Sequence, residues 1–414
     1  MSASAAAPKR LGDHPAFRYF WTARVLTSSG FQVAGVVVGW KVYADTGSAF
    51  ALGLVGLFQF MPMLLLTFVV GSVADRFDRR RIVMACQAVE CVTLATLAAG
   101  IIGGFLTVQG IFVAVVVLGG ARAFESPTLT SILPAVVPPS ILPRATAVSS
   151  SAMQSATIVA PSLAGLLYAI GPEVALGLGS ACYFAALLAM SLIRLERPPS
   201  TRQPVTLVSI FSGVAFIWSR KIILGAISLD MFAVLLGGAT ALLPIIADQL
   251  LQTGPVGLGL LRAAPAVGAL AMSFWLASHP LHAAGRALFI GVALFGLATL
   301  ALGLSRSLPL SLAILLLLGT ADLVSVVIRQ TLVQLHTPDE MRGRVSSVNA
   351  IFIGASNQLG EFESGLTAQW FGLVPSILLG GSGTLLVVGL WMRWFPQLLQ
   401  VRSLEEAMPA QNRP

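Results

Sequence analysis

Acidic side chains interrupt several long apolar segments of this sequence. Glu361 and Glu363 lie within the apolar stretch 345–371, and a carboxylate at the centre of a membrane helix costs roughly 2.5 to 3.5 kcal/mol. A medium of low dielectric favours the neutral acid, so such a group can take up and release a proton. These positions therefore indicate proton transfer or ligand contact, with a structural ion pair as the alternative.

Other charged or polar residues share this setting. The further candidates for contact with a substrate or a proton are Arg24, Asp230, Asp322 and Asn357. The other buried charges are Glu90, Arg122, Glu125, Arg262 and Arg329. Arg122 and Glu125 are three residues apart, which favours mutual neutralisation on one helix face. Arg329 is expected to anchor the cytoplasmic end of its helix, and Arg262 to attract an anionic substrate or to pair with a residue from the other half.

The two acids near residue 362 cannot form one adjacent pair. At about 100° per residue, side chains two positions apart on a helix point about 200° from each other. Glu361 and Glu363 therefore flank a stripe of small and polar residues from opposite sides, so one can face a cavity while the other pairs with a neighbouring helix. The stripe consists of Asn349, Ser356, Gly360, Ser364 and Thr367.

The composition identifies the elements that must hold these groups. Of 414 residues, 56% are hydrophobic and 10% charged, whereas about a quarter of a soluble protein is charged. Segments of about 20 apolar residues span a membrane as helices. We therefore predict an all-α membrane protein with twelve transmembrane helices. The predicted spans are 17–43, 49–74, 81–105, 109–130, 144–169, 173–195, 222–247, 255–278, 286–305, 308–334, 345–371 and 373–395.

The basic residues predict the orientation of the chain. The net charge is +8, and with the N-terminus in the cytoplasm nearly all Lys and Arg residues near helix ends fall on the cytoplasmic side. This asymmetry is the positive-inside rule, so both termini are expected to be cytoplasmic. The first residues lack the apolar core of a cleavable signal peptide. The charge thus indicates topology, and no nucleic-acid partner is expected.

A polar, Pro-rich linker divides the chain. We expect a cytoplasmic tail at 1–16, a six-helix half at 17–195, a linker at 196–221, a second half at 222–395 and a cytoplasmic tail at 396–414. Residues 207–221 of the linker predict a short amphipathic helix on the inner membrane surface. A shift of 200 positions brings Pro138 and Arg144 onto Pro338 and Arg344. Two six-helix repeats around a midplane cavity are typical of transporters.

The segment between the second and third predicted helices carries a motif. It reads "GSVADRFDRRRI" and resembles the "GxxxDRxGRR" signature of the major facilitator superfamily, with Asp78 where many members have Gly. Asp75 and Arg79 can pair if the helix continues between them. The resemblance implies that Asp75 helps to hold the halves together near Arg344, at the start of the eleventh helix. The predicted switch residues are Gly71, Asp75, Arg76, Arg79, Arg80 and Arg344.

A narrower resemblance involves "RQTLVQLHTPDEMRGRVSSVNAIFIGASNQLGEFESG", residues 329–365. It is similar to the enterobactin exporter branch of the superfamily, inner-membrane proteins of bacteria that expel catecholate siderophores. "APSLAG" at 160–165 is similar to the "GPxxGG" motif of proton antiporters. In this superfamily the seventh helix commonly lines the cavity, which favours a contact role for Asp230 and, by its similar depth in the first helix, for Arg24. The third helix is often peripheral, which disfavours Glu90.

The resemblance implies a proton-coupled exporter that works by alternating access. The expected substrate is a small amphiphilic molecule, with a catecholate siderophore first and a macrolide or other drug second. A membrane receptor or scaffold that transports nothing is the alternative from another class. We expect protons and membrane lipid as further partners, and a monomer.

Enzyme, metal and cofactor sites are not expected. Cys86, Cys91 and Cys182 lie within apolar helices, where thiols behave as small hydrophobes. His279 and His282 are three residues apart without an acidic or cysteine partner nearby. The sequence contains no phosphate-binding loop, zinc motif or nucleophile elbow.

Overall fold

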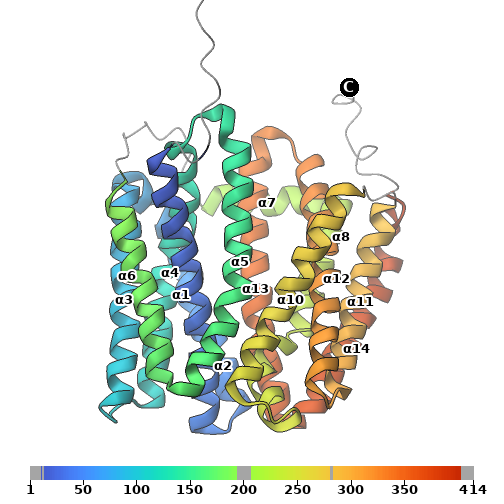
Figure 1. Cartoon of the computed structure of the whole chain (residues 1–414). Coiled ribbons are helices and arrows are strands. Elements are labelled where there is room, and N and C mark those ends of the chain that lie inside the picture. The colour runs from blue at the N-terminus through green and yellow to red at the C-terminus, as the bar shows by residue number, and fades with distance from the viewer. Residues whose placement is uncertain (1–10, 12–13, 194–206, 280–282, 402–414) are drawn as a thin grey trace, which may run out of the picture. The chain divides into compact units, whose positions relative to one another are not determined.

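The computed structural model describes residues 11, 14–193, 207–279 and 283–401, and these residues form helices and no strand (Figure 1). The predicted all-α fold is confirmed. The first helices are α1 (Pro15–Thr46), α2 (Ala49–Arg76), α3 (Arg79–Ile102), α4 (Val108–Val136), η2 (Pro139–Ile141), α5 (Leu142–Ile170) and α6 (Pro172–Ser191). After the linker come α7 (Leu207–Ser219), α8 (Lys221–Leu236), α10 (Gly254–Ser278), α11 (Ala284–Leu304), α12 (Leu308–Leu335), α13 (Asp339–Phe371), α14 (Leu373–Trp394) and α15 (Pro396–Leu399).

These helices cover the predicted membrane spans. Among the described residues, 11 segments are long and apolar enough to cross a membrane. The remaining predicted span is α13, which has 33 residues and is more polar because it carries Glu361 and Glu363. The short helix predicted for the linker is α7. The tails at 1–10 and 402–414 and linker residues 196–206 lie outside the described residues.

The seventh predicted span, 222–247, corresponds to the candidate span Lys221–Leu250, whose helix is interrupted. α8 ends at Leu236, and the 3₁₀ turn η3 (Ala239–Leu242), α9 (Leu243–Ile245) and the π turn η4 (Ile246–Leu250) follow. Gly237 and Gly238 occupy the break, and Pro244 follows it. Glycine weakens a helix, and proline cannot donate the hydrogen bond that would continue it.

The turn between α2 and α3 also differs from the prediction. α2 ends at Arg76 and α3 begins at Arg79, so no continuous helix places Asp75 and Arg79 on one face. Asp78 is the N-cap of α3, where its Oδ1 accepts a hydrogen bond of 2.9 Å from the backbone N–H of Arg80. This capping bond explains an aspartate at a position where the family signature has glycine.

The chain forms two compact units. The first consists of Met1–Val37 and Leu65–Pro204, and the second of Val38–Leu64 and Val205–Pro414. The final part of α1 and the first half of α2 therefore belong to the second unit. The predicted six-helix halves at 17–195 and 222–395 stay a prediction.

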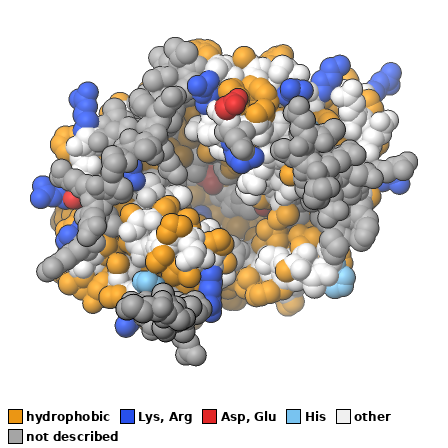
Figure 2. All heavy atoms as spheres, turned by 90° about the horizontal axis from the view of Figure 1, so that it is seen from above, with side chains coloured by type: hydrophobic (Ala, Val, Ile, Leu, Met, Phe, Trp, Pro, Cys, Tyr) orange, Lys and Arg blue, Asp and Glu red, His pale blue; other side chains and the backbone are white. Residues whose placement is uncertain are grey.

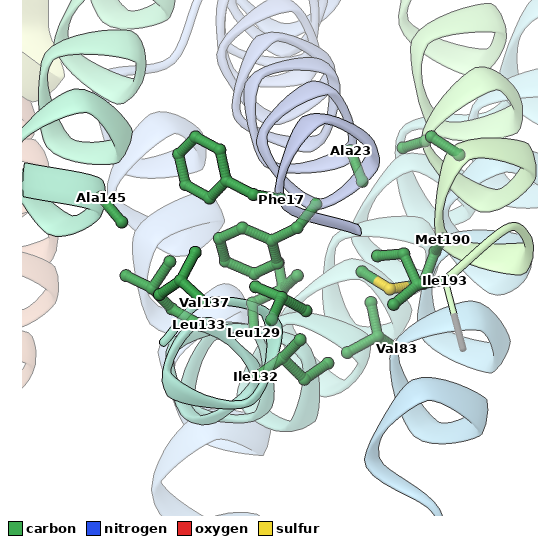
Figure 3. Packing of buried hydrophobic residues seen from close by; sticks show 14 of the residues in the cluster. Phe17, Ala23, Val83, Leu129, Ile132, Leu133, Val137, Ala145, Met190 and Ile193 are labelled. Atoms are coloured by element: carbon green, nitrogen blue, oxygen red, sulfur yellow. The ribbon is translucent and has the colours of Figure 1, made fainter. Parts of the chain in front are cut away.

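The first unit has an apolar cluster to which α1, α3, α4, α5 and α6 all contribute (Figure 3). Phe17, Val83, Ile132 and Met190 come together there, and each is at most 4% exposed. Close packing of this kind holds membrane helices together through van der Waals contact. The cluster fixes the spacing of α1, α3 and α4, on which the polar residues described below also lie.

Two apolar clusters organise the second unit. One joins α8, α11, α12, α14 and α15, and includes the fully buried Leu229, Phe289 and Ile328. The other joins α7 and α13 to α8 and α12 through residues such as Ile223 and Val345.

Lys and Arg side chains are spread over the face seen in Figure 2, where few Asp or Glu side chains are visible.

Candidate functional site: buried charged residues in each unit

The first unit contains a buried polar network between α1, α3 and α4. Arg122 Nη1 lies 3.5 Å from Glu125 Oε2, so the predicted pairing on α4 is confirmed. The hydroxyl of Thr27 donates to Glu125 Oε1 over 3.2 Å, and the amide of Gln87 donates to Thr27 Oγ1 over 3.0 Å. One carboxylate is thus held by groups from three helices, which lie side by side in Figure 1.

Glu90 and Arg24 extend this network. Glu90 is 1% exposed and faces the charges of Glu125 and Arg122, so its expected burial is confirmed. α3, on which it lies, packs against both α4 and α6. Arg24 lies beside Arg122, and its Nε contacts Met153 Sδ at 3.3 Å. The Arg122 guanidinium also covers the ring of Phe31, at 4.3 Å from the ring centroid.

A second buried ion pair lies in the second unit. Arg329 Nη2 of α12 is 3.3 Å from Asp230 Oδ2 of α8, and Arg329 Nη1 donates to Asn349 Oδ1 of α13 over 3.1 Å. Arg329 is only 2% exposed. Partners on two other helices thus hold Arg329, and its expected role as an anchor of the cytoplasmic helix end stays a prediction.

Asp322 joins this pair as a second carboxylate. It lies seven residues before Arg329 on α12, on the same helix face, and faces the charges of Asp230 and Arg329. The group contains two acids and one guanidinium. Asp230 and Asp322 thus lie close enough for their charges to interact. Sequence reasoning could not show this, since the two residues lie on different helices.

Glu361 and Arg262 form a further group in the second unit. Their charges attract each other, and each side chain extends over a glycine. A β-carbon at Gly56 of α2 would lie 2.7 Å from Glu361 Oε2, and one at Gly39 of α1 would lie 3.2 Å from Arg262 Nη2. The two glycines provide the space that these charged side chains occupy.

Glu363 has different surroundings. It is half-buried, and Ser364 Oγ donates to its Oε2 over 3.5 Å. Of Glu361 and Glu363, Glu361 is therefore the one that meets a cation.

The polar stripe of α13 packs against other helices. A β-carbon at Gly360 would lie 2.8 Å from the carbonyl oxygen of Val234, at the end of α8. The Thr367 and Ser376 hydroxyls are 2.7 Å apart and join α13 to α14. Asn357, in contrast, is exposed. The stripe thus positions Glu361 by close helix contact.

The switch residues predicted from the motif are described only in part. The side chains of Gly71 and Asp75 lie outside the described residues, and Arg76 is exposed. Arg79 is half-buried, and the Arg80 guanidinium donates to the backbone carbonyl of Ser191. Arg344 Nη1 donates to Ser212 Oγ of α7 over 3.3 Å. The role of these residues in a switch stays a prediction.

Sequence reasoning missed a group near the end of α1. The hydroxyl of Tyr43 donates to Asp248 Oδ2 over 3.3 Å, and the Gln249 amide donates to the Tyr43 hydroxyl over 2.8 Å. Asp248 and Gln249 lie in the π turn η4. The break after Gly237 was the signal that could have drawn attention to these residues, because π turns are frequent at functional sites.

The described residues contain no group of three or more His, Cys, Asp and Glu side chains that could hold a metal ion.

Comparison with known families identifies the protein more closely. A family model described as "Transmembrane secretion effector" matches residues 3–413. The chain belongs to this family. Secretion effectors of this kind are transporters of the major facilitator superfamily, as the loop motif predicted, and the protein is not an enzyme.

Individual relatives of this secretion effector agree. The enterobactin exporter EntS of Escherichia coli (strain SMS-3-5 / SECEC) is 27% identical over 414 residues, with 97% of each chain covered. A variant of the nucleoside transporter NupG has a similar structure, with a TM-score of 0.74 at 11% identity, covering 92% of this chain and all of that one. A bacterial homologue of the iron transporter ferroportin gives 0.68 at 18%, covering 92% and 98%. The secretion effector is therefore a multi-pass membrane exporter of the superfamily.

Proposed function

We propose that this secretion effector exports a catecholate siderophore such as enterobactin by proton antiport and alternating access. The observation that carries the proposal is the similarity to an enterobactin exporter along 97% of both chains. In this proposal the chain lies in the inner membrane of a bacterium as a monomer, with both termini in the cytoplasm.

The second unit supplies groups suited to the coupling. Asp230, Asp322 and Arg329 combine two carboxylates with one guanidinium. In a medium of low dielectric, a second carboxylate without its own cation favours the protonated form. Asp322 can therefore bind a proton while Asp230 stays paired with Arg329.

Glu361 and Arg262 are the proposed substrate-contacting groups. Arg262 offers a guanidinium that can meet the oxygens of a catecholate, and Glu361 balances its charge when no substrate is bound. Arg24, Asn357 and Glu363 stay weaker candidates. The described contacts of Arg24 are with Met153 and with the like charge of Arg122, Glu363 contacts the neighbouring Ser364, and Asn357 is exposed.

Transport in proteoliposomes tests the proposal. The purified protein is reconstituted, a pH gradient is imposed, and the movement of enterobactin and of a macrolide is measured with and without a protonophore. We expect enterobactin to move against its gradient only while the pH gradient lasts. If only the macrolide moves, the substrate is a drug and not a siderophore. If neither compound moves in response to the pH gradient, the proposed export is contradicted.

Asp322→Asn provides the matched test of coupling. This variant is expected to abolish transport driven by the pH gradient, whereas Glu340→Gln, at an exposed position near the start of α13, is expected to leave it unchanged. Equal gradient-driven transport in both variants would remove Asp322 from the coupling mechanism.

A further inference from the structure

The polar network of the first unit has an excess of negative charge. Glu90 and Glu125 are 1% and 0% exposed, and Arg122 is the cation that faces both. The cation compensates the charge of Glu125, whose Oε2 pairs with Arg122 and whose Oε1 accepts a hydrogen bond from Thr27. Two ionised carboxylates here would leave one buried negative charge without compensation, which is a strongly unfavourable state.

Two unsatisfied atoms lie beside this excess charge. Within the described part of the chain, neither Glu90 Oε2 nor Gln87 Oε1 has a hydrogen-bond partner, although both atoms are buried. Gln87 and Glu90 are three residues apart on one face of α3, and the Gln87 side chain also contacts Glu125. Both unsatisfied atoms are acceptors, so what this site lacks is a donor. A proton on Glu90 supplies one.

Among the residues that the structure describes, the other titratable groups around the pair do not supply a second cation to it. α3 contributes Cys86 and α6 contributes Tyr183 and Cys182, and each of these groups is neutral or negative. α1 contributes Arg24, which acts on Arg122 and contacts Met153 of α5. The balance at the pair is therefore two carboxyl groups against the single guanidinium of Arg122.

We propose that Glu90 and Glu125 hold one proton between them and form a second proton-binding site, in the first unit, besides the acids of the second. In the loaded state an O–H bond forms on Glu90 and can point to Gln87 Oε1, while Glu125 stays ionised against Arg122. Release returns the proton to water and breaks no other covalent bond. A role of this proton in coupling rests on the function proposed above, whereas the binding of the proton by Glu90 and Glu125 does not depend on that function.

Infrared spectroscopy of the full chain in lipid nanodiscs at neutral pH tests this site directly. The C=O band of protonated carboxyl groups, confirmed by its shift in D₂O, is scaled to the amide band. Glu90→Gln is expected to lose the amplitude of one carboxyl group. Arg122→Gln is expected to gain amplitude, because both acids then lack their cation. Glu340→Gln, at an exposed position, is expected to match the wild type.

The outcomes separate this site from the proposed function. An unchanged band in folded Glu90→Gln would overturn the shared proton, and so would a decrease in Arg122→Gln. Glu125→Gln gives an independent measurement if either variant unfolds, and it too is expected to lose the amplitude of one group.

Transport of enterobactin then tests the role in coupling. In Glu90→Gln we expect loss of transport driven by the pH gradient, with enterobactin counterflow retained. Gradient-driven transport at the wild-type rate would leave Glu90 as a proton-binding group outside the coupling. If the carboxyl band behaves as expected but the wild-type protein moves no enterobactin, the result supports the proton-binding site and contradicts the proposed substrate.

Discussion

Arg329 of α12 and Asp230 of α8 form an ion pair of 3.3 Å in which the two residues are only 2% and 6% exposed. The pair joins helices that are about 100 positions apart in the sequence. Asn349 of α13 takes a further guanidinium hydrogen of the same arginine. Three helices of the second unit thus meet at one side chain.

Removing one partner of this pair leaves a buried charge. We expect Asp230→Asn to destabilise the protein by about 3 to 5 kcal/mol, because Arg329 then loses the carboxylate with which it forms its ion pair. Thermal unfolding in detergent measures the effect. Asp45→Asn is the matched control, since the Lys41–Asp45 pair is partly exposed and is expected to contribute less than about 1 kcal/mol. Equal shifts of the melting temperature would contradict the importance of burial.

Gly56 leaves room for the carboxylate of Glu361. Gly56→Val is expected to displace this carboxylate from its position near Arg262 and to slow export, because a β-carbon there would lie 2.7 Å from Oε2. Gly389→Val is the control, as no atom lies within 4 Å of the β-carbon position there. Transport rates in vesicles, normalised to the amount of folded protein, measure the effect. A Gly56→Val protein that exports normally would show that the position of Glu361 is unimportant.

Glu361 and Glu363 of α13 are expected to differ in function. Glu361→Gln removes the negative charge that faces Arg262, so we expect a marked loss of gradient-driven transport. Glu363→Gln removes a half-buried carboxylate held by the neighbouring Ser364, and a smaller effect is expected. Transport is measured for both variants over a range of pH. A larger loss in Glu363→Gln would exchange the roles assigned here.

Tyr43 joins the end of α1 to the π turn η4. Tyr43→Phe deletes the hydroxyl that binds Asp248 and Gln249, and each lost hydrogen bond is expected to cost about 0.5 to 1.5 kcal/mol. Tyr19→Phe, at an exposed tyrosine, is the control. Thermal unfolding compares the two variants. If they melt at the same temperature, the contact contributes nothing measurable to stability.

The helices could be predicted from the sequence because membrane spans depend on local apolar length. Boundaries were accurate to a few residues where a loop follows, as at Ser305. The interruption after Leu236 was not predicted, although Gly237, Gly238 and Pro244 indicate it in hindsight. Hydropathy averages over about 20 residues, so it does not resolve a break within one span.

The sequence predicts which charged residues belong to the site better than it predicts which of them form pairs. Sequence alone identified Asp230, Arg329, Glu90 and Glu361 as unusual, because a buried charge is costly. It paired only Arg122 with Glu125, which are neighbours on one helix. The other partners lie on separate helices, and their meeting depends on packing that involves small residues such as Gly39.

The chain passes between its two units more often than its linker suggests. Residues 38–64 precede the linker in sequence, yet they are counted in the unit that follows it. Gly53 of α2 illustrates why, since a β-carbon there would lie 3.2 Å from the Cα of Gly365 on α13. A gene split at the linker would therefore leave the second unit without residues 38–64, which stay on the fragment that carries the first unit. During translation, residues 38–64 can meet their packing partners on α13 only after α13 has been synthesised.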